Sequence, residues 1–365
     1  MSKNITTRPG DLGVPFRLPL LILGFLSLAT GVGSGLLRMG WSAPLSPELV
    51  LLHGPLMLSG FLGTVICLER AVALGRRWAY AGPLLTGAGG VCILLGLPLA
   101  IGATAITGGS IVLVAGSILI TQRQRELFMV TMALGAASWL LGNILWLVGS
   151  PIAAVVALWI NFLVLTIAGE RLELSRFLPP SPIAKRIFTA ILAILLAGSV
   201  LTLLFANSYL YGFGLLALAL WLLRQDVARR TVKERGLTRF IAVCLLSGYA
   251  WLALGGLALL AAGILNGPAY DAVLHAILIG FVFSMVFGHA PVIFPSVVRV
   301  KMPYHWTFYL PLLVLHASLA TRFLGGTFDL LQLRNLGGLL NAAALALFIM
   351  STIASVIRGR KSANG

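Results

Sequence analysis

The sequence predicts an all-α, polytopic membrane protein of about twelve transmembrane helices, and three observations support this fold class. Of the 365 residues, 59% are hydrophobic and only 10% are charged, whereas ordinary soluble domains contain about 25% charged residues. Apolar runs long enough to cross about 30 Å of hydrocarbon recur along the chain. Basic residues concentrate in short segments between alternate runs, which is how membrane proteins fix their orientation. We therefore predict a single transmembrane domain over residues 1–365, with the lipid bilayer as its partner.

The predicted helices are apolar runs bounded by turn residues or charges. They cover residues 17–38, 47–73, 79–101, 104–120, 127–148, 151–170, 186–205, 208–223, 239–264, 270–295, 304–324 and 333–357. A turn signal at residues 149–151 separates two long apolar stretches and makes them two helices. Short tails, residues 1–16 and 358–365, flank the twelve runs.

The net charge of +16 would indicate a nucleic-acid partner in a soluble protein, but its distribution excludes that class. Of the 26 Lys and Arg residues, 23 fall in segments at or near one predicted side of the membrane. Only Arg38, Arg322 and Arg334 fall on the other side. By the positive-inside rule, both termini and the basic loop 224–239 are predicted to be cytoplasmic.

Five histidines are the strongest candidates for chemistry, because ionisable side chains within a membrane are costly and often functional. His53 and His275 lie about five to six residues into the second and tenth predicted helices, which run in the same direction. At 1.5 Å per residue, both imidazoles would lie roughly 8 Å below the outer boundary. Two imidazoles at one depth can hold haem iron from both faces. A hydrogen-bonded histidine pair, a histidine bonded to a backbone carbonyl and a proton relay in a transporter remain the alternatives.

The other histidines have weaker patterns. His289 follows His275 by fourteen residues and shares its helix face, close to the opposite membrane surface. We predict His289 and His316 as further metal ligands, with hydrogen-bonded interior histidines as the alternative. Met285 could offer a thioether to copper or haem, or pack in the core. His305, between Tyr304 and Trp306, is expected at the membrane interface.

Buried charges recur near the predicted cytoplasmic ends of the second and sixth helices, as Glu69–Arg70 and Glu170–Arg171. We expect Glu69 and Glu170 to be neutralised by a neighbouring arginine or by protonation, with pairing across helices, because an unpaired charge would be expensive at this depth. Helices two, six and ten contain the similar stretches LHGPLMLSGFLGTVICLER, NFLVLTIAGER and LHAILIGFVFSMVFGHA. A similarity that recurs every four helices suggests three repeats around a pseudo-threefold axis. The alternative is that membrane helices commonly end in charged residues.

The stretches LHGPLM around His53 and LHAILIGF around His275, in helices two and ten of twelve, resemble the haem–copper oxidase subunit I superfamily. Within that superfamily the chain is most similar to the NnrS family. The opening stretch FRLPLLILG, at residues 16–24 of this chain, resembles the start of NnrS proteins. The resemblance implies an oxidase-like bundle in the inner membrane of a prokaryote. It also implies b-type haem on His53 and His275, copper as a second candidate metal, and a redox partner protein.

The chain departs from that superfamily at the copper site. Oxidases place copper or iron on histidines of helices six and seven, whereas here helix six offers Asn161 and residues 185–205 contain no histidine. A complete oxygen-reducing centre is therefore not expected. The predicted function is electron transfer or redox handling related to nitric oxide and denitrification. A proton-coupled secondary transporter that uses buried His and Glu side chains is the alternative, and no motif identifies an enzymatic reaction.

Overall fold

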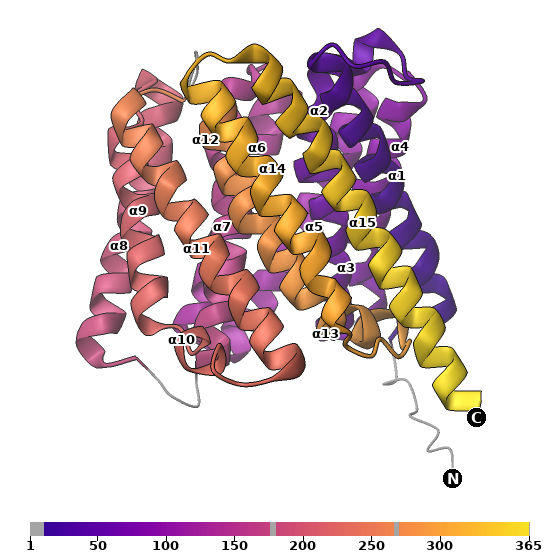
Figure 1. The fold of residues 1–365 in the computed structure, drawn as a ribbon. Coiled ribbons are helices and arrows are strands. Elements are labelled where there is room, and N and C mark those ends of the chain that lie inside the picture. The colour runs from indigo at the N-terminus through magenta and orange to yellow at the C-terminus, as the bar shows by residue number, and fades with distance from the viewer. Residues whose placement is uncertain (1–10, 176–179, 266–269, 365) are drawn as a thin grey trace. The chain divides into compact units, whose positions relative to one another are not determined.

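The computed structural model describes residues 11–175, 180–265 and 270–364, and its regular elements there are all helical (Figure 1). Within these ranges, ten helices or continuous helical segments are long and apolar enough to cross a membrane. The all-α architecture and the multi-pass character are therefore confirmed. Most of the predicted tail 1–16 lies outside the described residues, and the first helix begins earlier than expected, at Val14.

The chain divides into two compact units. Unit 1 comprises residues 1–155 and 295–299, and unit 2 comprises residues 156–294 and 300–365. The helical elements of unit 1 are α1 (Val14–Arg38), η1 (Pro47–Leu52), α2 (His53–Pro55), η2 (Leu56–Gly63), α3 (Thr64–Leu74), η3 (Arg77–Tyr80), α4 (Ala81–Leu94), α5 (Leu99–Arg123) and α6 (Leu127–Leu147).

Unit 2 contains most of α7 (Ile152–Leu174) and of α13, together with the helices that follow α7. Those helices are α8 (Pro182–Phe205), α9 (Tyr209–Gln225), α10 (Ala228–Thr231), α11 (Gly236–Ala262), α12 (Tyr270–His275), η5 (Ala276–Phe283), α13 (Ser284–Val298), η6 (Trp306–Phe308), α14 (Tyr309–Thr327) and α15 (Leu331–Asn364). Because α15 continues to Asn364, most of the predicted tail 358–365 is helical.

The turns between helices follow local backbone chemistry. Gly149 has a φ of +97° and separates α6 from α7, which confirms the predicted break. The break between α4 and α5 lies at residues 95–98, so the predicted boundary at residues 101–104 is wrong. Gly96 adopts a φ of +70° there, a left-handed conformation that glycine tolerates best, and Pro98 precedes the first turn of α5.

Consecutive helices cross closely at glycines, because glycine has no side chain to hold the two backbones apart. In the α4–α5 pair, a Cβ added to Gly89 would lie 2.7 Å from the Gly102 carbonyl oxygen. In the α8–α9 pair, a Cβ on Gly198 would lie 2.6 Å from the backbone nitrogen of Tyr211. Figure 1 shows α14 and α15 side by side, and a Cβ on Gly337 would meet the Arg322 backbone. Small residues therefore set the helix packing, as expected in lipid.

The second and tenth predicted helices share an irregularity. Each contains an eight-residue π-helical segment, η2 in unit 1 and η5 in unit 2. A hydroxyl residue follows each segment and bonds back to a glycine carbonyl at 2.6 Å, Thr64 to Gly60 and Ser284 to Gly280. π-helical segments are rare in proteins, and those that occur are often found at functional sites. The two segments therefore have closely similar local structure.

The neighbouring helices repeat the same contacts. Gly24 of α1 faces Thr64, with an added Cβ 3.3 Å from the Thr64 Cβ. Gly248 of α11 faces Ser284 in the same way, at 3.4 Å. Two further contacts in unit 1 have equivalents in unit 2. The contact of Ser27 with Gly60 corresponds to that of Trp251 with Gly280. The contact of Gly31 with Met57 corresponds to that of Gly255 with Ile277. The helix pair at the start of the chain and the pair formed by α11 with η5 and α13 therefore repeat one local arrangement of helix contacts.

Candidate functional site

His53 begins α2, and its ring is oriented by α1. Its Nδ1 lies 2.7 Å from the carbonyl oxygen of Gly31. Because a carbonyl can only accept a hydrogen bond, we infer that Nδ1 carries the proton and that Nε2 carries the lone pair. A Cβ on Gly35 would lie only 2.8 Å from Nδ1, so α1 also passes directly beside the ring. The backbone of α1 therefore sets both the tautomer and the position of this imidazole.

His275 ends α12 and is held in the same tautomer. Its Nδ1 lies 2.8 Å from the carbonyl oxygen of Asp271, one turn earlier in the helix, and 3.4 Å from a carboxylate oxygen of the same residue. The side chain is 13% exposed. A histidine whose Nδ1–H is held by a carbonyl or carboxylate presents Nε2 as its ligating atom, with raised basicity.

Asp271 is itself held by Arg322 of α14. The guanidinium donates from Nε to Oδ2 at 2.9 Å and from Nη2 to Oδ1 at 2.7 Å, a bidentate pair. Arg322 is one of the three basic residues that the charge distribution left on the predicted outer side, and its pairing with Asp271 explains its position. Asp271 was not predicted from the sequence. Its signal was its spacing, four residues before His275 on the same helix face, in a chain with only ten acidic residues.

The two predicted haem ligands lie in different units, His53 in unit 1 and His275 in unit 2. His275 immediately precedes η5, whereas His53 lies three residues before η2. Their positions in the internal repeat are therefore similar but not equivalent. Their pairing on one haem stays a prediction.

Arg171 is the centre of a second polar cluster, at the other end of the helices of unit 2. It is 4% exposed, and its Nε lies 2.8 Å from Oδ2 of Asp226, between α9 and α10. Tyr249 of α11 donates to the same carboxylate oxygen at 2.6 Å. The Ala228 backbone N–H donates to Oδ1 at 2.7 Å. Arg171 thus pairs with Asp226, a partner that the sequence did not indicate, and the neutralisation of Glu69 and Glu170 stays a prediction.

His289 of α13 belongs to this cluster, because its Nε2 lies 3.2 Å from Nη1 of Arg171. Arginine only donates, so Nε2 is the acceptor and a metal would compete with Arg171 for its lone pair. His316 of α14 accepts from the indole N–H of Trp251 at Nδ1, at 3.0 Å, which assigns its proton to Nε2. That N–H is buried without a partner among the described residues. Both arrangements favour hydrogen bonding over metal ligation.

The remaining predicted positions have simpler surroundings. His305 accepts at Nδ1 from the Thr307 backbone N–H at 3.3 Å and thereby caps η6. Asn161, in the helix where oxidases carry a metal ligand, donates to Ser199 of α8 at 2.9 Å. Within the described ranges, no three His, Cys, Asp or Glu side chains gather as a metal site. Copper therefore rests on the resemblance alone.

The Glu–Arg pairs fall at one place in the repeated pattern. Glu69 and Arg70 are half-buried in α3, and Glu170 is half-buried in α7. When the stretches GFLGTVICLER, NFLVLTIAGER and GFVFSMVFGHA are aligned on their shared phenylalanine, His289 stands where the two glutamates stand. The third copy of the pattern therefore keeps an ionisable side chain and replaces a carboxylate with an imidazole.

Unit 1 contains a comparable cluster that the sequence did not reveal. Arg17 is 1% exposed and pairs with Asp11 at 2.7 Å, while its Nη1 donates to the Val297 carbonyl at 3.1 Å. Tyr80 donates to Asp11 at 2.7 Å. Each unit thus contains a buried Arg–Asp–Tyr cluster.

Comparison with known proteins places the whole bundle in one family. Residues 17–357 match the family described as Domain of unknown function (DUF8744). The chain belongs to this family. No curated protein matches it, and no solved structure does. The DUF8744 match includes both histidines that precede π-helical segments and the Arg171 cluster, whereas Asp11 lies before its first residue. The two histidines and the Arg171 cluster thus lie within the region that matches the DUF8744 family.

Proposed function

We propose that the protein is a b-type haem protein of the membrane, with His53 and His275 as the two axial ligands of one haem. The observation that supports this most directly is the hydrogen bonding of the two rings. In each, Nδ1 lies within 2.8 Å of a backbone carbonyl oxygen, at Gly31 for His53 and at Asp271 for His275. This arrangement makes Nε2 the ligating atom of a neutral imidazole, which is the form that haem iron binds.

The donor set fits a six-coordinate haem. Two imidazole nitrogens suffice as axial ligands, and no further protein ligand is required. The group would supply one-electron redox chemistry, and the chain would orient its ligands and tune their basicity. The Asp271 carboxylate, itself held by Arg322, lies beside the ring of His275 and increases the electron density on that ligand. The proposed role is electron transfer or redox handling related to nitric oxide, in the inner membrane of a prokaryote.

The proposal includes a twelve-helix, NnrS-like and oxidase-like bundle with both termini in the cytoplasm. Two short helices would complete the twelve spans, α4 with 14 residues and α9 with 17. In the proposed twelve-helix topology, the repeat that relates α1 and η2 to α11 and η5 runs in one direction across the membrane, whereas an inverted repeat is the architecture of many transporters. A third, central copy would give the pseudo-threefold arrangement that the sequence suggests.

A second candidate function is proton-coupled transport. It is favoured by the cluster of Arg171, Asp226, Tyr249 and His289, because ionisable groups buried in membrane helices often belong to proton pathways. The two candidates differ in one directly measurable property, since only the first requires a chromophore.

The test is the absorption spectrum of protein purified in detergent, oxidised and then reduced with dithionite. We expect sharp haem bands from a low-spin, six-coordinate iron. Replacing His53 or His275 with Ala should leave a five-coordinate, high-spin haem or remove the haem. The matched control is His305→Ala, which should keep the wild-type spectrum because His305 caps η6. An unchanged low-spin spectrum with full haem content in His53→Ala would refute the assignment and favour the transporter.

A further inference from the structure

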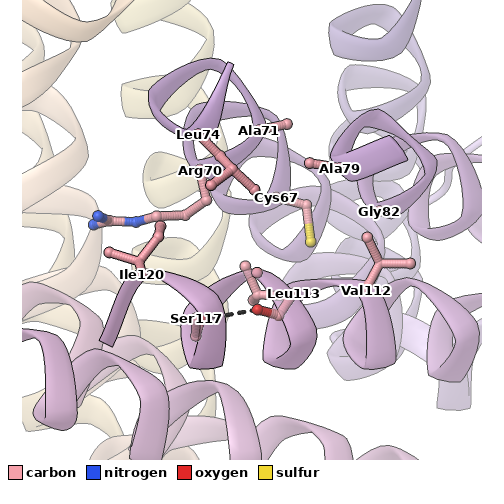
Figure 2. Close-up of a pocket in the computed structure, with 11 residues that line it drawn as sticks. Cys67, Arg70, Ala71, Leu74, Ala79, Gly82, Val112, Leu113, Ser117 and Ile120 are labelled. Carbon is pink, nitrogen blue, oxygen red and sulfur yellow. Dashed lines mark hydrogen bonds between the residues drawn. The ribbon is translucent and has the colours of Figure 1, made fainter. Parts of the chain in front are cut away.

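Unit 1 has a shallow, partly open groove lined by residues of α3, α4 and α5 (Figure 2). Its walls are small and apolar, and include Ala71, Gly82, Val112 and Gly116. Figure 2 shows the Cys67 thiol on the groove side of α3, and a Cβ added to Gly82 would lie 3.6 Å from its sulfur. A wall of this kind suits a hydrocarbon chain and offers few partners to a soluble metabolite.

The polar groups of the groove are already satisfied or point elsewhere. The Ser117 hydroxyl donates to the Leu113 carbonyl at 2.8 Å, the bond drawn in Figure 2. Arg70 extends away from the Cys67 thiol in the same view. The interior of the groove therefore offers van der Waals contact, and recognition of a polar group must come from its rim.

Basic and aromatic side chains follow the groove residues closely in the sequence, and we place them at its rim. Arg77 follows the lining residue Leu74 by three residues, and Arg123 follows the lining residue Ile120 by three, in the last turn of α5. Both arginines are exposed. Trp78 is 39% exposed, and its ring lies 3.8 Å from where a Cβ on Gly116 would be. Tryptophan with arginine beside an apolar surface is typical of the level of lipid headgroups.

We infer that this groove binds one anionic phospholipid, with an acyl chain between α3 and α5 and the phosphate between Arg77 and Arg123. Charge complementarity favours this occupant, because the rim is cationic at an end of the helices predicted to face the cytoplasmic leaflet. That leaflet is rich in anionic lipids. The apolar walls add shape recognition of a chain, which free phosphate lacks. The inference depends on membrane embedding and is independent of haem binding.

The experiment is native mass spectrometry of the full-length protein in detergent, titrated with phosphatidylglycerol. Phosphatidylcholine with the same chains and inorganic phosphate serve as the comparison ligands. We expect one tightly bound phosphatidylglycerol, several-fold weaker binding of phosphatidylcholine, and no binding of phosphate. Arg123→Gln should weaken phosphatidylglycerol binding about fivefold, the effect of one interfacial charge. Arg230→Gln removes an exposed charge from unit 2 and should leave the affinity unchanged.

A second variant tests the acyl chain. Gly116→Leu should fill the groove, since a Cβ there meets its nearest atoms only at 3.8 Å and the longer side chain extends into the groove space. We expect it to abolish the preference for phosphatidylglycerol while the melting temperature stays near the wild-type value. Equal weakening by Arg230→Gln and Arg123→Gln would overturn the site in favour of general charge attraction. Wild-type affinity in Gly116→Leu, or equal binding of both lipids to the wild type, would overturn it as well. If Gly116→Leu fails to fold, the comparison of the two arginine variants decides.

Discussion

Replacing Asp226 with Ala should destabilise the protein by about 3–5 kcal/mol, because it leaves Arg171 as an uncompensated buried charge. Arg171 is 4% exposed, and the only carboxylate described within hydrogen-bonding distance of its guanidinium is that of Asp226. The same carboxylate accepts from Tyr249 and from the Ala228 backbone, so the substitution also removes two further hydrogen bonds. This loss is large against a typical total stability of about 5–15 kcal/mol.

Thermal unfolding in detergent, followed by tryptophan fluorescence, measures this effect. We expect Asp226→Ala to lower the melting temperature by roughly 10 °C. Glu234→Ala is the matched control, since it removes an exposed carboxylate from the same loop and should change stability by less than about 0.5 kcal/mol. The double variant Arg171→Met with Asp226→Ala should recover much of the loss, because no buried charge remains. Equal melting temperatures for Asp226→Ala and Glu234→Ala would refute the reasoning.

Three further predictions concern other parts of the chain. In the haem-loaded protein, Asp271→Asn should raise the midpoint potential by on the order of 50 mV, because the anion beside the ligand histidine is lost; spectroelectrochemical titration measures it. Gly255→Leu should destabilise by about 1–3 kcal/mol, since even a Cβ there would lie 2.8 Å from Ile277, whereas exposed Leu254→Ala should cost less in the same melting assay. Alkaline phosphatase fused after Arg235 should be inactive, and an active fusion would contradict the predicted topology.

The helices were predictable because long apolar runs favour membrane-spanning helices. The break at Gly149 was predictable because a turn signal at residues 149–151 interrupts the apolar sequence there. The break at Gly96 was placed several residues too late, since the apolar run continues through it and hydropathy does not register a left-handed glycine. The π-helical segments were missed for a related reason. Pro55 directly precedes the segment in the second helix, but His275 stands at that point in the tenth helix, so proline does not explain both segments.

The ion pairs were predictable only in part. Depth within a helix indicated that Arg171 needs a partner, but the partner is set by tertiary packing and lies 55 residues away at Asp226. The same holds for Asp11 with Arg17 and for Asp271 with Arg322. In a chain with only ten acidic residues, each acidic residue near an apolar run could have been treated as a candidate partner.

The repeated sequence pattern relates His289 to the two Glu–Arg pairs. The pattern that ends in Glu69–Arg70 and Glu170–Arg171 ends in His289–Ala290 in its last copy, so that copy lacks the arginine of the other two. In unit 2 the imidazole of His289 instead accepts a hydrogen bond from Arg171, which belongs to the middle copy. Loss of the carboxylate and of the arginine together keeps the charge of that copy balanced, since a neutral imidazole needs no counter-ion. His289 is therefore best understood as the third member of a repeated set of ionisable positions, and this role explains its place without a metal.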